Sequence, residues 1–214
     1  MDSIMKKVDL ATYKRRGMFE AFKDRDIPFI ATTSNVDITH LKRHVEEHKN
    51  GFFLAVSFLI SKVVNLVPEL RHRIIAGELY EFSKVDPAFT VLMPDDSFSF
   101  CDSRCFDTFQ EYRAYSAARI QETRTCPDHS VGDKNHMFFI TSVPWFSFTS
   151  IVHPYCQQYG TIPVVTIGKF FQQGDRLMLP VGLQVHHGVV DGFHLGRFYG
   201  LLEEMCGSPE AYLT

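Results

Sequence analysis

Apolar residues recur at intervals of three and four along several segments of the chain, a spacing typical of amphipathic helices. The predicted helices cover residues 40–48, 52–67, 106–122 and 191–206. Asp37-Ile-Thr39 is typical of a helix start and precedes the first of them. Pro68 is expected to end the second, because proline cannot continue a helix.

Short runs rich in β-branched and aromatic residues predict strands between these helices. The predicted strands cover residues 27–36, 79–82, 88–92, 98–100, 138–143, 163–171 and 176–186. The last two are joined by Gln172-Gln-Gly-Asp175, which is typical of a hairpin turn. Helices interspersed with such hairpins predict the α/β class, with a mixed β-sheet flanked by helices.

The length of 214 residues predicts one domain spanning 1–214. Apolar residues make up 45% of the chain and charged residues 22%, which excludes a mostly disordered protein. The formal charge of −3 argues against nucleic-acid binding, since a phosphate-binding face usually needs a basic excess.

No segment predicts secretion or a membrane span. The start of the chain has no apolar stretch of signal-peptide length, and polar residues interrupt the most apolar run, 52–67. The five cysteines form an odd set without a CxxC pair, so reduced thiols and a cytoplasmic location are expected.

The clearest candidate chemistry lies in residues 184–192, at the end of the last predicted strand. His186 and His187 should point to opposite faces there, one toward the core and the other toward a cleft. Gly188 and Gly192 allow a tight turn and close approach of a ligand. A neutral imidazole in that cleft could take a proton from an alcohol or thiol that attacks an acyl carbon.

The same residues have two plainer interpretations. A histidine pair beside an aspartate is more often a hydrogen-bonded structural corner than a catalytic site. If the segment were helical, His187, Asp191 and His194 would share a face and could bind a metal ion. Gly188 and Gly192 disfavour that helix.

Two other sets of possible metal ligands have ordinary explanations. His40, His44 and His48 recur every four residues, but they are interleaved with charged side chains and fit a solvated helix face. Cys101 and Cys105 lie four residues apart without a second ligand pair, so they are interpreted as packing thiols. No metal site is expected.

The motif His186-His-Gly-Val-Val-Asp-Gly192 resembles the HHxxxDG signature of the chloramphenicol acetyltransferase family. Further segments resemble the family in the same order along nearly the whole chain. They cover residues 13–20, 36–39, 67–71, 84–91, 141–145, 148–150 and 172–180. The resemblance implies a CoA-dependent acyltransferase-like fold, an α+β-type two-layer sandwich.

The resemblance also implies an O-acetyltransferase that moves acetyl from acetyl-CoA, a co-substrate, to a hydroxyl of chloramphenicol. His187 is the implied general base, which deprotonates the acceptor hydroxyl for direct attack on the thioester without an acyl-enzyme. Asp191 is implied to support the site by pairing with Arg15. Removing either partner of such an ion pair strands the other charge.

Further site residues follow from the resemblance. Thr141 stands where the family has a serine that stabilises the oxyanion, and Thr166 matches a threonine that helps the intermediate through a bound water. Ala21 and Phe22 match one form of the acceptor pocket, and Phe29 lies where many members have a cysteine. Other pocket positions that depart from common family residues are Gly17, Met18, Phe82 and Met93.

The family implies a homotrimer whose active sites lie at the subunit interfaces, with chloramphenicol and acetyl-CoA as the small-molecule partners. One alternative is an acyltransferase of the same fold with another acceptor, such as an oxoacid-dehydrogenase core acting on dihydrolipoamide. The other is a non-catalytic trimeric binding protein, which is supported only by Thr141 and the altered pocket.

Overall fold

The computed structural model describes residues 4–129 and 132–214, and its main sheet has seven strands. In spatial order the path is β2 (Phe29–Asp37), β10 (Arg176–His186), β8 (Val164–Ile167), β7 (Met137–Ser142), β5 (Asp86–Leu92) and β6 (Phe98–Asp102). The seventh strand, β9 (Phe171–Gln173), pairs with β10 next to β8. Strand β7 runs parallel to β5 and β8, and the other pairs are antiparallel. The predicted mixed sheet is confirmed.

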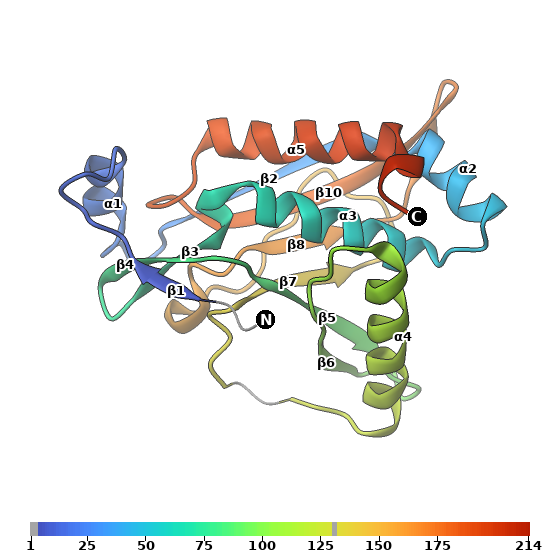
Figure 1. Ribbon diagram of the computed structural model, residues 1–214, viewed down its shortest axis with the longest axis horizontal. Helices are drawn as coiled ribbons and strands as arrows, with labels where there is room; N and C mark the ends of the chain where they lie inside the picture. Colours follow the sequence, from blue (N-terminus) through green and yellow to red (C-terminus); the bar gives the residue numbers. More distant parts are fainter. Residues whose placement is uncertain (1–3, 130–131) are drawn as a thin grey trace.

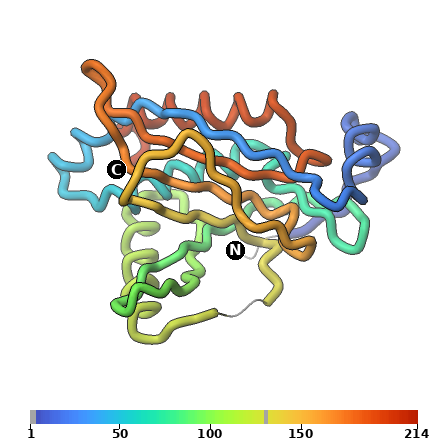
Figure 2. The backbone as a smooth tube through the Cα atoms, turned by 180° about the vertical axis from the view of Figure 1, so that it is seen from behind, coloured from blue at the N-terminus to red at the C-terminus, as the bar shows by residue number. Residues whose placement is uncertain are grey.

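The longer helices form a layer on one face of this sheet. They are α2 (Thr39–Glu47), α3 (Phe52–Leu66), α4 (Phe109–Thr125) and α5 (Gly192–Gly207). Helix α3 contacts both α4 and α5, and Figure 1 shows these three in front of the strands. Seen from behind in Figure 2, the strands and the loop that follows β7 lie in front instead. This arrangement confirms the two-layer fold class.

A small antiparallel sheet stands beside the main one, with β4 (Glu78–Phe82) between β1 (Met5–Lys7) and β3 (His72–Ile75). The fully buried Arg73 of β3 donates hydrogen bonds to the carbonyl oxygens of Asn135 and Met137 and so ties this sheet to β7. Burial lowers the pKa of Arg73 to about 9. The remaining elements are α1 (Arg16–Phe22) and the 3-10 helices η1 (Pro68–Arg71), η2 (Gln157–Tyr159) and η3 (Pro209–Ala211).

Side chains alternate between the two faces of the central strands, as the pleat requires. On β8, Val165 and Ile167 belong to the apolar core, and Thr166 lies between them. On β7, Ile140 belongs to the same core and Thr141 follows it. The threonines therefore lie on the face turned away from the helices.

Most predicted elements are present within two residues of their expected ends, but two predictions are wrong. The helix expected from 106 begins at Phe109, because the Thr108 side chain caps it by accepting a hydrogen bond from the Glu111 amide. The strand expected over 163–171 is broken between β8 and β9. Both β8 and β9 pair with the same edge of β10, and the break between them lies opposite Pro180. The carbonyl of Pro180 accepts a hydrogen bond from the Gly168 amide, but proline has no N–H to donate back to Gly168.

Three short elements, β1, β3 and α1, were not predicted. Strands β1 and β3 have three and four residues, and helix α1 has seven, too few for a periodic pattern to stand out. Within the described residues, none of the helices combines the length and the apolar character needed to cross a membrane.

Candidate active site

His187 lies in a turn between the end of β10 and the start of α5, which we call the His187 turn (residues 187–191). Its backbone N–H donates to the carbonyl of Pro28 at 2.7 Å, and its Nδ1 lies 3.0 Å from the carbonyl oxygen of Val190. A carbonyl oxygen only accepts, so Nδ1 carries a proton, and the neutral form of this ring has its lone pair on Nε2. The ring is therefore held in the tautomer that a general base needs.

The neighbouring histidine has the opposite environment. The His186 residue is 3% exposed, and its Nδ1 accepts a hydrogen bond from the Gly188 amide at 3.1 Å. Burial, with a smaller contribution from His187, lowers the pKa of His186 to about 4 and keeps the ring neutral. A Cβ on residue 188 would lie 3.0 Å from the His186 ring, so glycine allows the turn to pass this close.

Asp191 anchors the far end of the His187 turn. Its side chain caps α5 by accepting from the Phe193 amide at 3.1 Å, and it forms an ion pair with Arg15. His194 adds a contact, with Nδ1 2.8 Å from Asp191 Oδ1 and Nε2 3.5 Å from Glu69 Oε1. Burial alone would raise the pKa of Asp191, but Arg15 and His194 lower it below its usual value.

The metal-binding alternative requires a helix through this segment, and that requirement is not met. Helix α5 begins only at Gly192, so His187 does not share a helical face with Asp191 and His194. On α2, the rings of His44 and His48 stack at 4.2 Å instead of converging on an ion. Among the described residues, no group of three or more His, Cys, Asp or Glu side chains could hold a metal ion. All five cysteines are free thiols.

The predicted pocket residues separate into two places. The Phe22 ring packs on His187, with ring centroids 4.4 Å apart, and the guanidinium of Arg25 lies over the same Phe22 ring. The carbonyl of Ala21 accepts from Arg25 Nε. Phe29 instead contacts Tyr155, with centroids 5.9 Å apart. Phe22 therefore packs on the histidine ring, whereas Phe29, the register partner of His186 on β2, lies against Tyr155, which lines the cavity described next.

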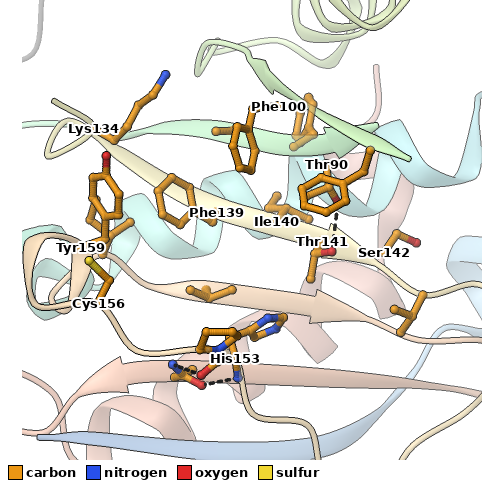
Figure 3. Close-up of a pocket in the computed structure, with 18 of the residues that line it drawn as sticks. Thr90, Phe100, Lys134, Phe139, Ile140, Thr141, Ser142, His153, Cys156 and Tyr159 are labelled. Carbon is orange, nitrogen blue, oxygen red and sulfur yellow. Dashed lines mark hydrogen bonds between the residues drawn. The ribbon is translucent and has the colours of Figure 1, made fainter. Parts of the chain in front are cut away.

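A cavity of about 640 Å³ opens on the face of the sheet away from the helices, and Figure 3 shows the residues around it. Thr141 lines it, with Oγ1 2.9 Å from Oγ1 of Thr90 on β5. Thr141 is also the register partner of Thr166 on β8. Thr90, Thr141 and Thr166 thus lie side by side on three neighbouring strands, and we call them the hydroxyl row.

Thr166 is only 1% exposed and lies behind a histidine that the sequence analysis missed. Nε2 of His153 lies 2.6 Å from Thr166 Oγ1, and His153 itself lines the cavity. Burial lowers the pKa of His153 below its ordinary value. His153 comes from the irregular segment between β7 and β8, where no periodic pattern or motif marks it.

His187 is not among the residues that line the cavity within one chain. The residues around the cavity include Thr141, His153 and Tyr155 but not His187, whose ring packs on Phe22. One chain therefore presents an oriented imidazole in one place and a hydroxyl-lined cavity in another.

Comparisons with known proteins identify the family of the chain. The sequence model of the family described as chloramphenicol acetyltransferase matches residues 4–203. "Chloramphenicol acetyltransferase 2" of Escherichia coli is 35% identical over 206 residues, covering 94% of this chain and 96% of that protein. "Chloramphenicol acetyltransferase 3" of Escherichia coli is 35% identical over 210 residues, covering 94% and 97%.

Solved structures show the same fold. A chloramphenicol acetyltransferase superposes with a TM-score of 0.83 at 21% identity, covering 95% of this chain and all of that one. The dihydrolipoamide acetyltransferase of Azotobacter vinelandii superposes with a TM-score of 0.70 at 19% identity, covering 87% and 84%. The resemblance inferred from the motif around His187 is confirmed.

Proposed function

Because the chain belongs to the chloramphenicol acetyltransferase family, we propose that it transfers the acetyl group of acetyl-CoA to a hydroxyl of chloramphenicol. The observation that carries this mechanism is the hydrogen bond from His187 Nδ1 to the Val190 carbonyl, which leaves Nε2 free to accept a proton. Acetyl-CoA is a co-substrate, and no step requires a metal. We treat residues 1–214 as one acetyltransferase domain.

The reaction proceeds by direct attack. His187 Nε2 takes the proton of the acceptor hydroxyl as that oxygen bonds to the thioester carbonyl carbon. The carbonyl oxygen becomes an oxyanion, toward which the Thr141 hydroxyl donates a hydrogen bond. Collapse of the tetrahedral intermediate breaks the C–S bond, and the proton on His187 passes to the departing CoA sulfur. The products are the acetyl ester and free CoA, with no acyl-enzyme.

The surrounding residues keep the groups in place. Asp191 and Arg15 hold the end of the His187 turn, and Phe22 packs on the His187 ring. Thr166 is buried and hydrogen-bonded to His153, so it acts through His153 and does not contact the substrate directly. Ala21, Phe22 and Phe29 contribute to the acceptor pocket, whose aromatic lining suits a nitrophenyl ring.

We further propose a homotrimer in which His187 of one chain faces the cavity of the next. The proposal is supported by the absence of His187 from the cavity wall that Thr141 lines, since base and oxyanion donor must meet around one thioester. Exposed aromatic side chains close to Thr141 support such an interface: Trp145 is 61% exposed and Phe146 is 52% exposed. The free thiols and the co-substrate fit a cytoplasmic enzyme.

The activity is tested by thiol release. Purified protein is incubated with acetyl-CoA, with and without chloramphenicol, and free CoA sulfhydryl is measured. Chloramphenicol-dependent release supports the proposal, and release with other alcohols only would identify an acyltransferase with a different acceptor. Absence of release with chloramphenicol and with a panel of alcohols and amines would exclude the enzymatic function and favour a binding protein.

The shared site is tested by mixing two variants. H187A lacks the base and T141A lacks the hydroxyl, so each should be slow alone. In trimers formed at random from equal amounts of both, about a quarter of the interfaces combine an intact His187 with an intact Thr141. Activity should therefore rise well above that of either variant. A site within one chain predicts no rise, because every chain then carries one defect.

A further inference from the structure

We propose that His153 is a second histidine of the reaction centre, whose Nδ1–H donates a hydrogen bond from the cavity wall to the oxyanion of the tetrahedral intermediate. The inference rests on the proposed function for its substrate and on the described contacts of His153 for its chemistry. It assigns to the cavity a donor that the family resemblance does not include.

The backbone of His153 is held firmly although it lies in an irregular segment. Its N–H donates to Oε1 of Gln184 at 2.8 Å, and its carbonyl accepts from Nε2 of the same side chain at 3.4 Å. Gln184 is buried on β10, three residues before His187. Strand β10 therefore holds the backbone of His153 and leads directly into the His187 turn.

The buried hydroxyl of Thr166 determines which nitrogen of His153 carries the proton. Thr166 is 1% exposed as a residue, and a buried hydroxyl that does not donate its proton to an acceptor loses the free energy of a hydrogen bond. Within the described residues, its hydrogen-bond partner is Nε2 of His153 at 2.6 Å. Thr166 therefore donates and Nε2 accepts, which places the proton of the neutral ring on Nδ1.

The Nδ1–H of His153 is then the donor that the ring can offer to a molecule in the cavity. His153 lines the cavity, and among the described residues its Nδ1 has no hydrogen-bond partner, although it is not one of the fully buried unpaired atoms. In Figure 3 the His153 ring lies on the same half of the cavity as Thr141, away from Lys134 and Tyr159. The burial that lowers the pKa of His153 also keeps the ring neutral, as this arrangement requires.

The oxyanion would thus accept hydrogen bonds from two donors, the Thr141 hydroxyl and the His153 Nδ1–H, which are arranged in the same way. Thr141 has Thr90 behind it, and His153 has Thr166 behind it, so in each case a second hydroxyl orients the donor that faces the substrate. Because Thr141 and Thr166 are register partners on β7 and β8, both donors approach the cavity from the same level of the sheet. Such preoriented donors stabilise developing charge without reorganisation.

The tautomer is tested without any turnover. In protein labelled with ¹⁵N-histidine, the His153 resonances are identified by their loss in H153N, and their shifts at neutral pH report which nitrogen is protonated. We expect a protonated Nδ1 and an unprotonated Nε2, which is the less common tautomer of free histidine. T166V should shift the ring toward the Nε2–H form. A protonated Nε2 in the unmodified protein overturns the inference.

The catalytic role is tested with three substitutions of the same residue. The Asn side chain in H153N places an amide N–H near the former Nδ1, whereas the Gln in H153Q reaches only toward Thr166, and the Leu in H153L does neither. Loss of the cavity donor should lower kcat about 10- to 100-fold in H153Q and H153L, with little change in the KM for acetyl-CoA, and H153N should recover most of it.

Controls separate this role from folding and from the proposed function. H40L, which changes an exposed histidine on α2, should leave kcat unchanged, and thermal unfolding should show that all variants fold. Equal losses in H153N and H153L, or a change in KM alone, overturn the catalytic role. If the unmodified protein turns over no acceptor, the proposed function fails, and the tautomer measurement still decides the state of His153.

Discussion

The His187 turn and the hydroxyl row present reactive groups in two different ways. The turn has no strand pairing of its own. It is held by single contacts, namely the hydrogen bonds of His187 with the Pro28 and Val190 carbonyls and the Arg15–Asp191 ion pair. The row lies within three paired strands, so the register of β5, β7 and β8 sets the spacing of its side chains. The base can therefore be displaced by one remote substitution, whereas the hydroxyls can be removed but hardly moved.

The largest effect is expected from the turn itself. H187A removes the base and should lower kcat about 10²- to 10⁴-fold, while the affinity for acetyl-CoA and the melting temperature stay close to those of the unmodified protein. Steady-state kinetics and calorimetric binding provide the measurement. H40A, which changes an exposed histidine on α2, is the matched control. A full-rate H187A would rule out this residue as the base.

On the side of the hydroxyl row, T141V keeps the shape of the side chain and removes its hydroxyl. Loss of one oxyanion donor typically lowers the rate about 10²- to 10³-fold, so T141V should fall in that range, with KM values largely unchanged. T141S restores the hydroxyl and should recover activity. Equal rates for T141V and T141S would show that this hydroxyl does not touch the reacting atoms.

Because the His187 turn depends on single contacts, a substitution of Asp191 should lower both the stability and the activity. D191N leaves the Arg15 guanidinium partly buried without its counter-charge and should cost about 2–3 kcal/mol of unfolding free energy. It should also lower kcat, because the turn loses its anchor, and this combination distinguishes it from T141V. Urea unfolding gives the first quantity and thiol release the second. A variant with normal stability would show that the ion pair does not support the turn.

The smallest effect concerns pH. Burial lowers the pKa of His186 to about 4, against about 6.5 in the unfolded chain, so between these values the unfolded chain binds the extra proton. Stability is therefore fully present above pH 6.5 and falls as the pH drops toward 4, by about 2 kcal/mol at pH 5 from this residue alone. His72, with its pKa also lowered to about 4 by burial, adds to the same trend.

Urea unfolding at pH 7 and pH 5 measures this loss. H186Q removes the titrating ring, so its stability should change less between the two pH values than that of the unmodified protein. An equal change in both proteins would assign the acid sensitivity to other groups.

The sequence predicted long elements well because each carries several turns of one periodicity, as α3 does. It could not predict the break after β8, because the cause is a missing N–H on Pro180, on a different strand. The same limit applies to the site. The motif identified His187 and Asp191, but the contact between His153 and Thr166 joins two segments 13 residues apart and exists only after folding.

The pairing of β10 with β2 gives the tandem histidines a further consequence. From Met178 to His186 every residue of β10 faces a partner on β2. Sliding this strand by a single position would exchange the roles of the two rings, sending the solvent-facing imidazole into the apolar interior and the interior one outward. The register of β10 with β2 thus sets which way each histidine ring points. Any insertion or deletion between 178 and 186 should therefore abolish the activity even if the chain still folds.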